Sequence, residues 1–248
     1  VGWILLRSLL RGRVWSRVMK TDLLDLRNVD CMELMAGYPD GYFDWAVVDP
    51  PYFDGPQKLG FYGGRCSKTG VARNGYKKLG TWQVPGQDYF DELVRVSKNQ
   101  LIWGFNYYSI ENLGSGRLIW DKLNAAPTFS DCEVAYLSSI DSVRKYTYMW
   151  NGMMQGSAAD GSVMEGNKRL NEKRIHPTQK PVRLYAWFFE NYVEAGQRVL
   201  DTHLGSASSA VAAHYAGLEF VGCELDPEYF LAACDRVERD TRQEIMKF

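Results

Sequence analysis

The residues Asp49, Pro50, Pro51 and Tyr52 directly follow an apolar stretch at 43–48. Two prolines cannot continue a hydrogen-bonded ladder, so the strand predicted there must end. The Asp49 carboxylate and the Pro50 carbonyl then offer two acceptors on a stiff loop, and Tyr52 offers a flat face for stacking. Such acceptors suit an aromatic amine, a poor nucleophile that must be held with a pyramidal nitrogen. The alternative is a Pro-Pro turn with Asp49 as an ordinary turn residue.

Three more blocks follow in order, at His176–Pro181 (HPTQKP), Asp201–Ser206 (DTHLGS) and Gly222–Tyr229 (GCELDPEY). Together with Asp49–Tyr52 they resemble the DNA amino-methyltransferases, in the group whose D-P-P-Y motif precedes the cofactor motif. The resemblance runs from about residue 22 to residue 229. It implies a site-specific enzyme that transfers a methyl group from S-adenosylmethionine to N6 of adenine in double-stranded DNA, with the target base flipped out of the duplex.

The resemblance also implies the catalytic residues, which are Asp49, Pro50, Pro51 and Tyr52. The family associates D-P-P-Y mostly with adenine and S-P-P-Y with N4 of cytosine, so Asp49 favours adenine. The transfer is an in-line displacement that needs alignment rather than a metal. Two alternatives stay open: methylation of N4 of cytosine in DNA or of RNA, and a non-catalytic DNA-binding relative. The recognition sequence, a homodimer and a cognate restriction enzyme are left undecided.

The cofactor residues implied by the resemblance lie at expected strand ends, where open α/β sheets bind ligands. Glu224 would accept both ribose hydroxyls, and Asp30 would lie near the adenine of the cofactor. Gly205 would let the backbone approach, with a helix from about Ser206 pointing its amides at the ligand. The full set is Asp30, Thr178, Lys180, Asp201, Gly205, Ser206 and Glu224, with Thr178 and Lys180 closing over the cofactor. The alternative is that the acidic residues are strand-end and helix caps.

The glycine loop departs from the family pattern D-P-F-x-G-x-G, because Thr202, His203 and Ala207 replace its proline, phenylalanine and last glycine. A positive φ at Ala207 would cost on the order of 1 kcal/mol. The departure also removes the G-x-G-x-x-G fingerprint, which argues against a nicotinamide dehydrogenase. We assign no proton-transfer role to His176.

The segment from Gly55 to Gln87 is rich in glycine and contains basic residues but no Asp or Glu. Its basic residues are Lys58, Arg65, Lys68, Arg73, Lys77 and Lys78. Because it follows the D-P-P-Y block, it is predicted to contact DNA phosphates, which position a duplex without reading its sequence. The alternative is a solvated surface loop.

The elements expected around these motifs alternate in the last third of the chain. A helix is expected at 181–192, a strand at 198–201, a helix at 206–215, a strand at 220–224 and a helix from Pro227 onward. Strands are also expected at 43–48, 100–103, 117–120 and 133–137, and helices at 32–35 and 88–96. This alternation predicts an α/β, Rossmann-like methyltransferase fold with a mostly parallel sheet and helices on both faces.

The composition fits one globular domain, with 248 residues, 46% hydrophobic side chains and a net charge of -1. That balance excludes a uniformly basic coat but permits a local basic groove. Five scattered cysteines without a C-x-x-C pair, and three histidines without metal-ligand spacing, argue against a disulfide framework and a zinc site. They favour a reducing cytoplasm. No apolar run approaches the ~20 residues of a membrane span.

Residues 1–18 are expected to be a leader or upstream extension, with a basic amphipathic helix or targeting segment as one alternative. Residues 19–248 are then expected to form a single methyltransferase domain. The stretch 151–173 is rich in Gly, Asn and Ser and has no clear period. A small target-recognition insertion is therefore expected at about 140–175.

Overall fold

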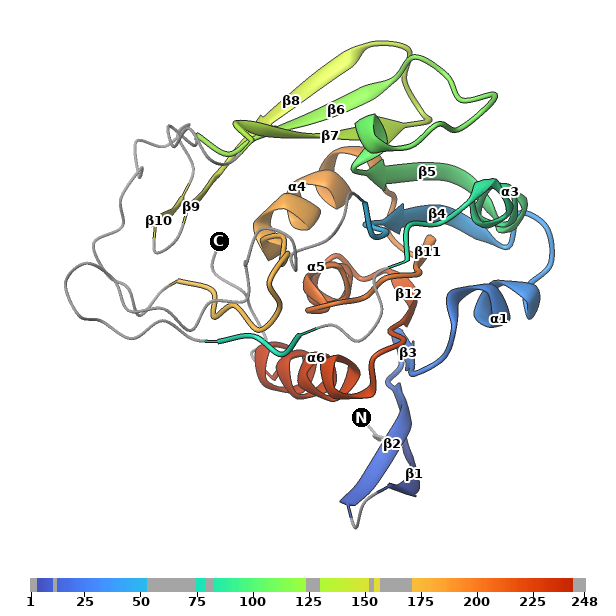
Figure 1. The fold of residues 1–248 in the computed structure, drawn as a ribbon, viewed down its shortest axis with the longest axis vertical. Coiled ribbons are helices and arrows are strands. Elements are labelled where there is room, and N and C mark those ends of the chain that lie inside the picture. The colour runs from blue at the N-terminus through green and yellow to red at the C-terminus, as the bar shows by residue number, and fades with distance from the viewer. Residues whose placement is uncertain are drawn as a thin grey trace.

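The computed structural model describes residues 4–10, 13–52, 75–78, 83–123, 130–151, 154–156 and 171–242, with only the backbone described for 4–16 and 151–154. The described strands form a ten-stranded sheet in the order β1-β2-β3-β12-β11-β4-β5-β7-β6-β8 and a two-stranded sheet of β9 and β10. Helices cover both faces of the large sheet (Figure 1).

The centre of the sheet is parallel. It consists of β3 (Leu24–Arg27), β12 (Glu219–Cys223), β11 (Arg198–Asp201), β4 (Phe43–Val48) and β5 (Ser97–Trp103). Each neighbouring pair among these five strands runs parallel. Their carboxyl ends therefore meet at one edge, where the acidic residues singled out in the sequence follow the strands.

The outer strands change direction. On one side β7 (Cys132–Leu137) pairs antiparallel with β5 and with β6 (Arg117–Asp121), and β8 (Val143–Thr147) adds parallel to β6. On the other side β2 (Arg13–Lys20) pairs antiparallel with β3 and with β1 (Ile4–Leu10). The small sheet joins β9 (Met149–Asn151) to β10 (Met154–Gly156).

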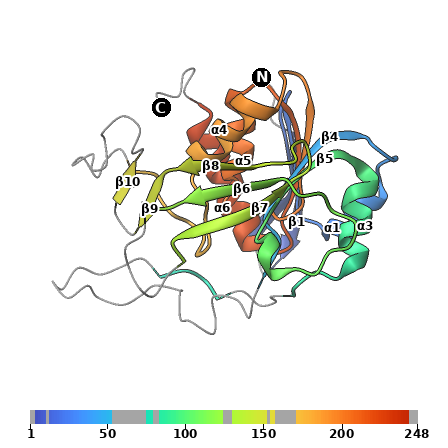
Figure 2. The same ribbon diagram turned by 90° about the horizontal axis from the view of Figure 1, so that it is seen from above.

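Two helix layers bury the two faces of the central strands (Figures 1 and 2). One layer holds α1 (Cys31–Ala36) and α3 (Gln87–Val96), and the other holds α4 (Val182–Tyr192), α5 (Ser208–Tyr215) and α6 (Pro227–Asp240). A short 3-10 turn, η1 (Phe105–Tyr107), follows β5.

The strand β4 is apolar except for Asp44, and its packing shows why. Trp45 and Val47 belong to the core under α4 to α6, whereas Phe43, Ala46 and Val48 belong to the core under α1 and α3. A strand buried on both faces cannot alternate polar and apolar residues, so it reads as a continuous apolar run. Pro50 and Pro51 end this buried strand, so Asp49 lies at its carboxyl end.

The predicted fold class is confirmed, and the expected central strands and helices are present with shifts of a few residues. The helix expected from Pro181 starts at Val182, with Pro181 as its N-cap, and the helix expected near Ser206 starts at Ser208. None of the described helices is long and apolar enough to cross a membrane.

Two expectations about chain organisation change. The described part of residues 1–18 forms β1 and most of β2, not a helix, and β2 continues through Lys20 into the main sheet. Within the insertion expected at about 140–175, residues 143–147 are a strand of the main sheet, paired with β6. Residues 157–170 of that insertion lie outside the described residues.

Candidate active site

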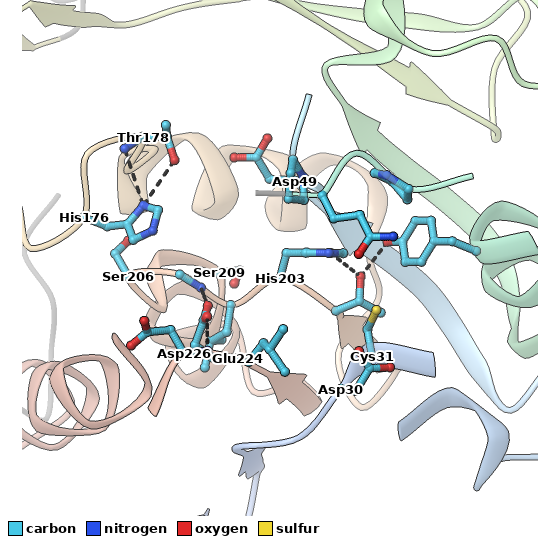
Figure 3. A pocket seen from close by; sticks show the side chains of 18 of the residues that line it. Asp30, Cys31, Asp49, His176, Thr178, His203, Ser206, Ser209, Glu224 and Asp226 are labelled. Atoms are coloured by element: carbon cyan, nitrogen blue, oxygen red, sulfur yellow. Dashed lines mark hydrogen bonds between the residues drawn. The ribbon is translucent and has the colours of Figure 1, made fainter. Parts of the chain in front are cut away.

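A cavity of about 550 Å³ opens at the carboxyl edge of the parallel strands. Four of its lining residues, Asp30, Asp49, His203 and Glu224, come from the loops after β3, β4, β11 and β12. In Figure 3 Asp49 lies at one side of the cavity, and Asp30 and Glu224 lie at the other. The topology thus gathers residues that are far apart in the sequence, as expected for an open α/β sheet.

Asp49 has two carboxylate oxygens in different situations. Oδ2 lies 2.5 Å from the Lys180 ammonium, whereas Oδ1 is buried and has no hydrogen-bond partner among the described residues. Burial raises the pKa of Asp49, and the charge of Lys180 opposes this rise. A buried acceptor without a donor is costly, so Oδ1 is a site for a donor from a ligand.

The HPTQKP block holds Lys180 through its backbone. The Lys180 carbonyl accepts a hydrogen bond from the Ser208 hydroxyl at 2.7 Å, and the Gln179 carbonyl accepts one from the Trp150 indole at 2.8 Å. The next residues are fixed too, because the Val182 N–H donates to Glu172 at 2.7 Å. The Lys180 side chain is only 2% exposed and points to Asp49. Its ammonium forms ion pairs with Asp49 and with Glu133, and Lys180 also lines the cavity.

The Pro50 carbonyl, the second predicted acceptor, already receives the Tyr108 hydroxyl at 2.7 Å, and the Pro51 carbonyl receives the same hydroxyl at 3.1 Å. A carbonyl oxygen has two lone pairs, so Pro50 retains one for a ligand. Tyr108 was not singled out in the sequence. It braces the turn, and burial raises its pKa, so the hydroxyl stays a neutral donor.

Tyr52 stacks on Tyr107, with ring centroids 4.9 Å apart and ring planes 10° apart. The turn that allows this contact requires glycine: Gly104 has φ +71°, and a Cβ there would lie 2.3 Å from the Tyr52 ring. Tyr107 is 49% exposed and extends the aromatic surface beyond the motif. Pro50 and Tyr52 do not line the cavity, whereas Asp49 and Pro51 do.

The two carboxylates after β11 and β12 are held by short-range donors. Asp201 accepts from the His203 N–H at 3.0 Å and from the Ser209 hydroxyl at 2.5 Å, and Glu224 accepts from the N–H groups of Gly205 and Asp226, both at 2.9 Å. Burial raises the pKa of Asp201 to about 7. Glu224 lines the cavity but Asp201 does not, so Asp201 braces the turn from behind.

The remaining predicted cofactor residues line the cavity. Asp30 does so while its Oδ1 accepts from the N–H of Met32 at 2.8 Å as the N-cap of α1. The Thr178 hydroxyl forms a hydrogen bond with the Nδ1 of His176 at 3.1 Å. Burial lowers the pKa of His176 to about 4, which leaves the ring neutral at pH 7.

The glycine loop is strained where it departs from the family pattern. Ala207 has φ 59° and ψ 28°, the left-handed conformation that favours glycine, and Gly205 has φ +52°. The α5 helix begins directly after Ala207 without a side-chain cap, and Ser206 and Ser208 of this turn line the cavity. The first N–H groups of α5 therefore remain available to a ligand.

Thr202 and His203, which replace the proline and phenylalanine of the pattern, form a small polar network. The Thr202 hydroxyl lies 2.6 Å from the Tyr89 hydroxyl and 2.9 Å from the Nδ1 of His203. Burial lowers the pKa of His203 to about 4, so its ring is a neutral wall of the cavity at pH 7. Tyr89, on α3, was missed in the sequence because it looked like an ordinary core residue of an amphipathic helix.

The predicted basic loop is described only in part. Lys58, Arg65, Lys68 and Arg73 lie outside the described residues. Lys77 and Lys78 are exposed, but the Lys77 ammonium lies 2.8 Å from Asp226 and 3.3 Å from Glu228 at the start of α6. Tyr229 adds a hydrogen bond to the Lys77 carbonyl at 2.7 Å. Lys77 thus attaches this segment to α6, and Lys78, the other described lysine of this segment, is exposed.

The comparisons with known proteins agree with this geometry. A family model described as DNA methylase matches residues 137–235, which contain the three blocks after Asp49–Tyr52. Type II methyltransferase M2.DpnII of Streptococcus pneumoniae is 23% identical over 225 residues, covering 79% of this chain and 83% of its own length. YubD of Escherichia coli (strain K12), which carries the name of a methylase, is 25% identical over 221 residues, covering 84% and 87%.

A solved structure has the same fold. PvuII DNA methyltransferase, named as cytosine-N4-specific, superposes with a TM-score of 0.55 at 14% identity, covering 90% of this chain and 92% of its own. The chain therefore has the fold of the S-adenosylmethionine-dependent methyltransferases, and S-adenosylmethionine is the cofactor of that class. Within the class it is similar to the DNA amino-methyltransferases of the N6-adenine and N4-cytosine type, so the resemblance based on the sequence blocks is confirmed.

Proposed function

We propose that this chain is a site-specific DNA methyltransferase that transfers a methyl group from S-adenosylmethionine to N6 of adenine. One observation carries the proposal: Asp49 ends β4 at the cavity with one oxygen paired to Lys180 and the other, Oδ1, buried without a hydrogen-bond partner among the described residues. A primary amine on a base supplies the donor that Oδ1 lacks. The aspartate, in place of the serine of S-P-P-Y, favours adenine over cytosine.

The cavity suits the methyl donor in charge and in hydrogen bonding. Glu224 keeps free lone pairs after its two backbone bonds, so it can accept ribose hydroxyls, and Asp30 adds a second carboxylate near the other end of the wall. The uncapped start of α5 beside Ser208 offers N–H groups to an anionic group. When bound, S-adenosylmethionine supplies an electrophilic methyl group on a sulfonium.

The residues after β4 would act on the amine. Asp49 Oδ1 accepts one N–H, and the free lone pair of the Pro50 carbonyl accepts the other, which directs the nitrogen lone pair at the methyl carbon. As the nitrogen takes the methyl group, Asp49 would accept the amine proton and pass it to water. Asp49 need not be a strong base, because the nitrogen becomes acidic only as that bond forms.

The aromatic residues beside this turn would receive the base. Tyr52 and Tyr107 already stack on each other, and Tyr107 is half exposed. A flipped adenine can join such a stack, since base–aromatic stacking contributes about 1–3 kcal/mol and every base has a flat face. The stack would offset part of the cost of taking the base out of the duplex.

Product analysis tests the proposal directly. Purified protein is incubated with methyl-labelled S-adenosylmethionine and mixed-sequence double-stranded DNA, and the digested nucleosides are separated by mass spectrometry. N6-methyladenine is the expected product. N4-methylcytosine would correct the target base, and methylation of RNA alone would correct the substrate. Absence of any methylated nucleoside, together with no calorimetric binding of the cofactor, would make the chain a non-catalytic relative.

A further inference from the structure

A row of four alternating charges ends at the candidate acceptor. Lys122 Nζ lies 2.8 Å from Glu133 Oε1, Lys180 Nζ lies 3.0 Å from Glu133 Oε2, and the same Lys180 Nζ lies 2.5 Å from Asp49 Oδ2. The four residues come from the end of β6, from β7, from the segment before α4 and from the end of β4. The antiparallel strands β6 and β7 contribute no residue to the described cavity lining. Ion pairs connect Glu133 of β7, and Lys122 just after β6, to Asp49.

Because these four side chains are largely buried, each charge needs an oppositely charged neighbour. Side-chain exposure is 2% for Lys180, 17% for Lys122 and Asp49, and 19% for Glu133. A charge in such surroundings is tolerated only when opposite charges and hydrogen bonds satisfy it. Lys180, the most buried of the four, is placed between two carboxylates and so cannot move toward one without leaving the other.

This arrangement decides which oxygen of Asp49 is free. An ammonium with a single carboxylate partner can bridge both oxygens of that carboxylate, because it has three rotatable donors. Glu133 Oε2 forms an ion pair with Lys180 at 3.0 Å beside the Lys180 contact with Asp49 Oδ2, and neither Glu133 Oε2 nor Asp49 Oδ1 has a hydrogen-bond partner among the described residues. Glu133, which does not line the cavity, thus determines which oxygen of Asp49 remains free to accept a hydrogen bond.

We propose that Glu133 is a positioning residue for methyl transfer: it fixes the Lys180 ammonium on Oδ2 of Asp49 and so keeps Oδ1 directed at the target amine. Lys122 balances the charge of Glu133 at the far end of the row. The inference rests on the proposed function, since it assigns Asp49 the acceptor role. It moves Lys180 from the predicted cofactor contacts to the support of Asp49.

Removing the charge of Glu133 has a definite electrostatic sign. Glu133 raises the pKa of Asp49 and Lys180 lowers it. Replacing Glu133 by Gln therefore lowers the pKa of Asp49 and moves the acid limb of the kcat profile to lower pH. The titratable groups coupled to Asp49 from the elements around it are Lys122, Glu133, Lys180, Asp201, Tyr52, Tyr108 and Tyr185.

The first experiment compares wild type with Glu133→Gln in methyl transfer to DNA and in cofactor binding by calorimetry. We expect kcat to fall about tenfold or more, with the acid limb shifted to lower pH and the Kd for S-adenosylmethionine within twofold of wild type. Glu133→Asp keeps the charge but shortens the reach, so kcat should fall while the acid limb moves less. Thermal unfolding verifies that both variants fold.

Two further variants test the route of the effect. If Glu133 acts through Lys180, then Glu133→Gln adds little to Lys180→Met, and the double variant loses less than the product of the two single effects. Lys145→Gln is the matched control, because Lys145 of β8 forms an exposed ion pair with Asp121 of β6 at 3.2 Å and belongs to no ion pair of the row. Its kcat should equal that of wild type.

The outcome for Glu133→Gln decides the proposal by itself. A folded Glu133→Gln protein with unchanged kcat and pH profile, beside an active wild type, would overturn it. A Kd raised tenfold by Lys180→Met would return Lys180 to the cofactor contacts and overturn it equally. An inactive wild type would instead contradict the proposed function, so the two failures are distinguishable.

Discussion

The two sides of the cavity hold their carboxylates by different means. On the side of β11 and β12, Asp201 accepts from the His203 N–H and the Ser209 hydroxyl, and Glu224 accepts from the N–H groups of Asp226 and of Gly205, which lies in the loop after β11. On the side of β4, Asp49 is held by a lysine more than a hundred residues away in the sequence, and that lysine is held by Glu133. Local hydrogen bonds define one wall, and a long-range row of charges defines the other.

The difference indicates what each wall does. A carboxylate that accepts hydrogen bonds from backbone N–H groups and a hydroxyl is held rigidly and is suited to binding a ligand. A carboxylate paired through one oxygen only retains an acceptor that nothing in the described protein satisfies. The first wall should therefore govern affinity for the cofactor, and the second should govern turnover.

The largest expected effect is that of Asp49→Ala on turnover. It removes the acceptor aimed at the amine, and loss of one such group typically costs about 10²–10³ in kcat. Cofactor affinity should stay near that of wild type, because the Asp49 side contributes little to the binding wall. Single-turnover methylation and calorimetry measure the two quantities separately. Turnover within about tenfold of wild type would break the division between the walls.

Glu224→Ala should give the opposite pattern. It leaves ribose hydroxyls without an acceptor and should weaken cofactor binding by about 1–3 kcal/mol, with kcat at saturating cofactor largely retained. Because Glu224 also accepts two backbone N–H groups, Glu224→Gln serves as the control that keeps one acceptor. An unchanged Kd in Glu224→Ala would place the ribose contact elsewhere.

The binding wall was predictable from the sequence for a physical reason. Its carboxylates follow predicted strands and its glycine lies in the turn before a predicted helix. The residue types at Asp201, Gly205 and Glu224 therefore already indicate that these residues lie at the carboxyl edge of the sheet. The parallel sheet was predictable as well, because alternating strands and helices admit few other arrangements. Even the positive φ at Ala207 followed from the position of the missing glycine.

The catalytic wall was not fully predictable, because its contacts are long-range. Nothing near Asp49 in the sequence points to Glu133, and Lys180 looked like a cofactor residue within its own motif. One signal was present: Glu133 is a charged residue in an otherwise apolar predicted strand. The strand β8 was missed because its first three residues are exposed, so it lacks the apolar run of the central strands.

The third prediction concerns the pH dependence of stability on the binding wall. Burial lowers the pKa of His203 to about 4 in the folded state, below about 6.5 for an unfolded chain. The folded protein then binds fewer protons, so stability present above about pH 6.5 is lost as the pH falls toward 4. His203→Phe, which restores the family residue, removes this dependence. When the pH is lowered from about 7.5 to 5, the free energy of unfolding measured in urea should fall by about 2 kcal/mol less in the variant than in wild type. Parallel curves for both proteins would contradict the neutral, buried state of His203.

The fourth prediction tests the strain beside the same turn. Ala207→Gly relieves about 1–2 kcal/mol of left-handed backbone strain but gives up a buried methyl group of about 0.8 kcal/mol. The net gain in unfolding free energy should therefore be under about 1 kcal/mol, with slightly tighter cofactor binding. Ala210→Gly is the control, because Ala210 is equally buried but lies in the helix α5. It should lose stability, and equal losses in both variants would show that Ala207 is not strained.

The smallest expected effect lies outside both walls, in the basic segment that is predicted to contact DNA phosphates. Lys78 is exposed, whereas Lys77 is paired with Asp226 and Glu228. If Lys78 neutralises one phosphate, Lys78→Ala should reduce the slope of log affinity against log salt by about 0.9, on cognate and random DNA alike. Lys77→Ala is the matched control, because its charge is already balanced within the protein and its removal should change the slope less. Fluorescence anisotropy over a series of salt concentrations measures both slopes. A larger change for Lys77→Ala would mean that DNA displaces the ion pair at α6, and no change for Lys78→Ala would make this lysine part of a solvated surface only.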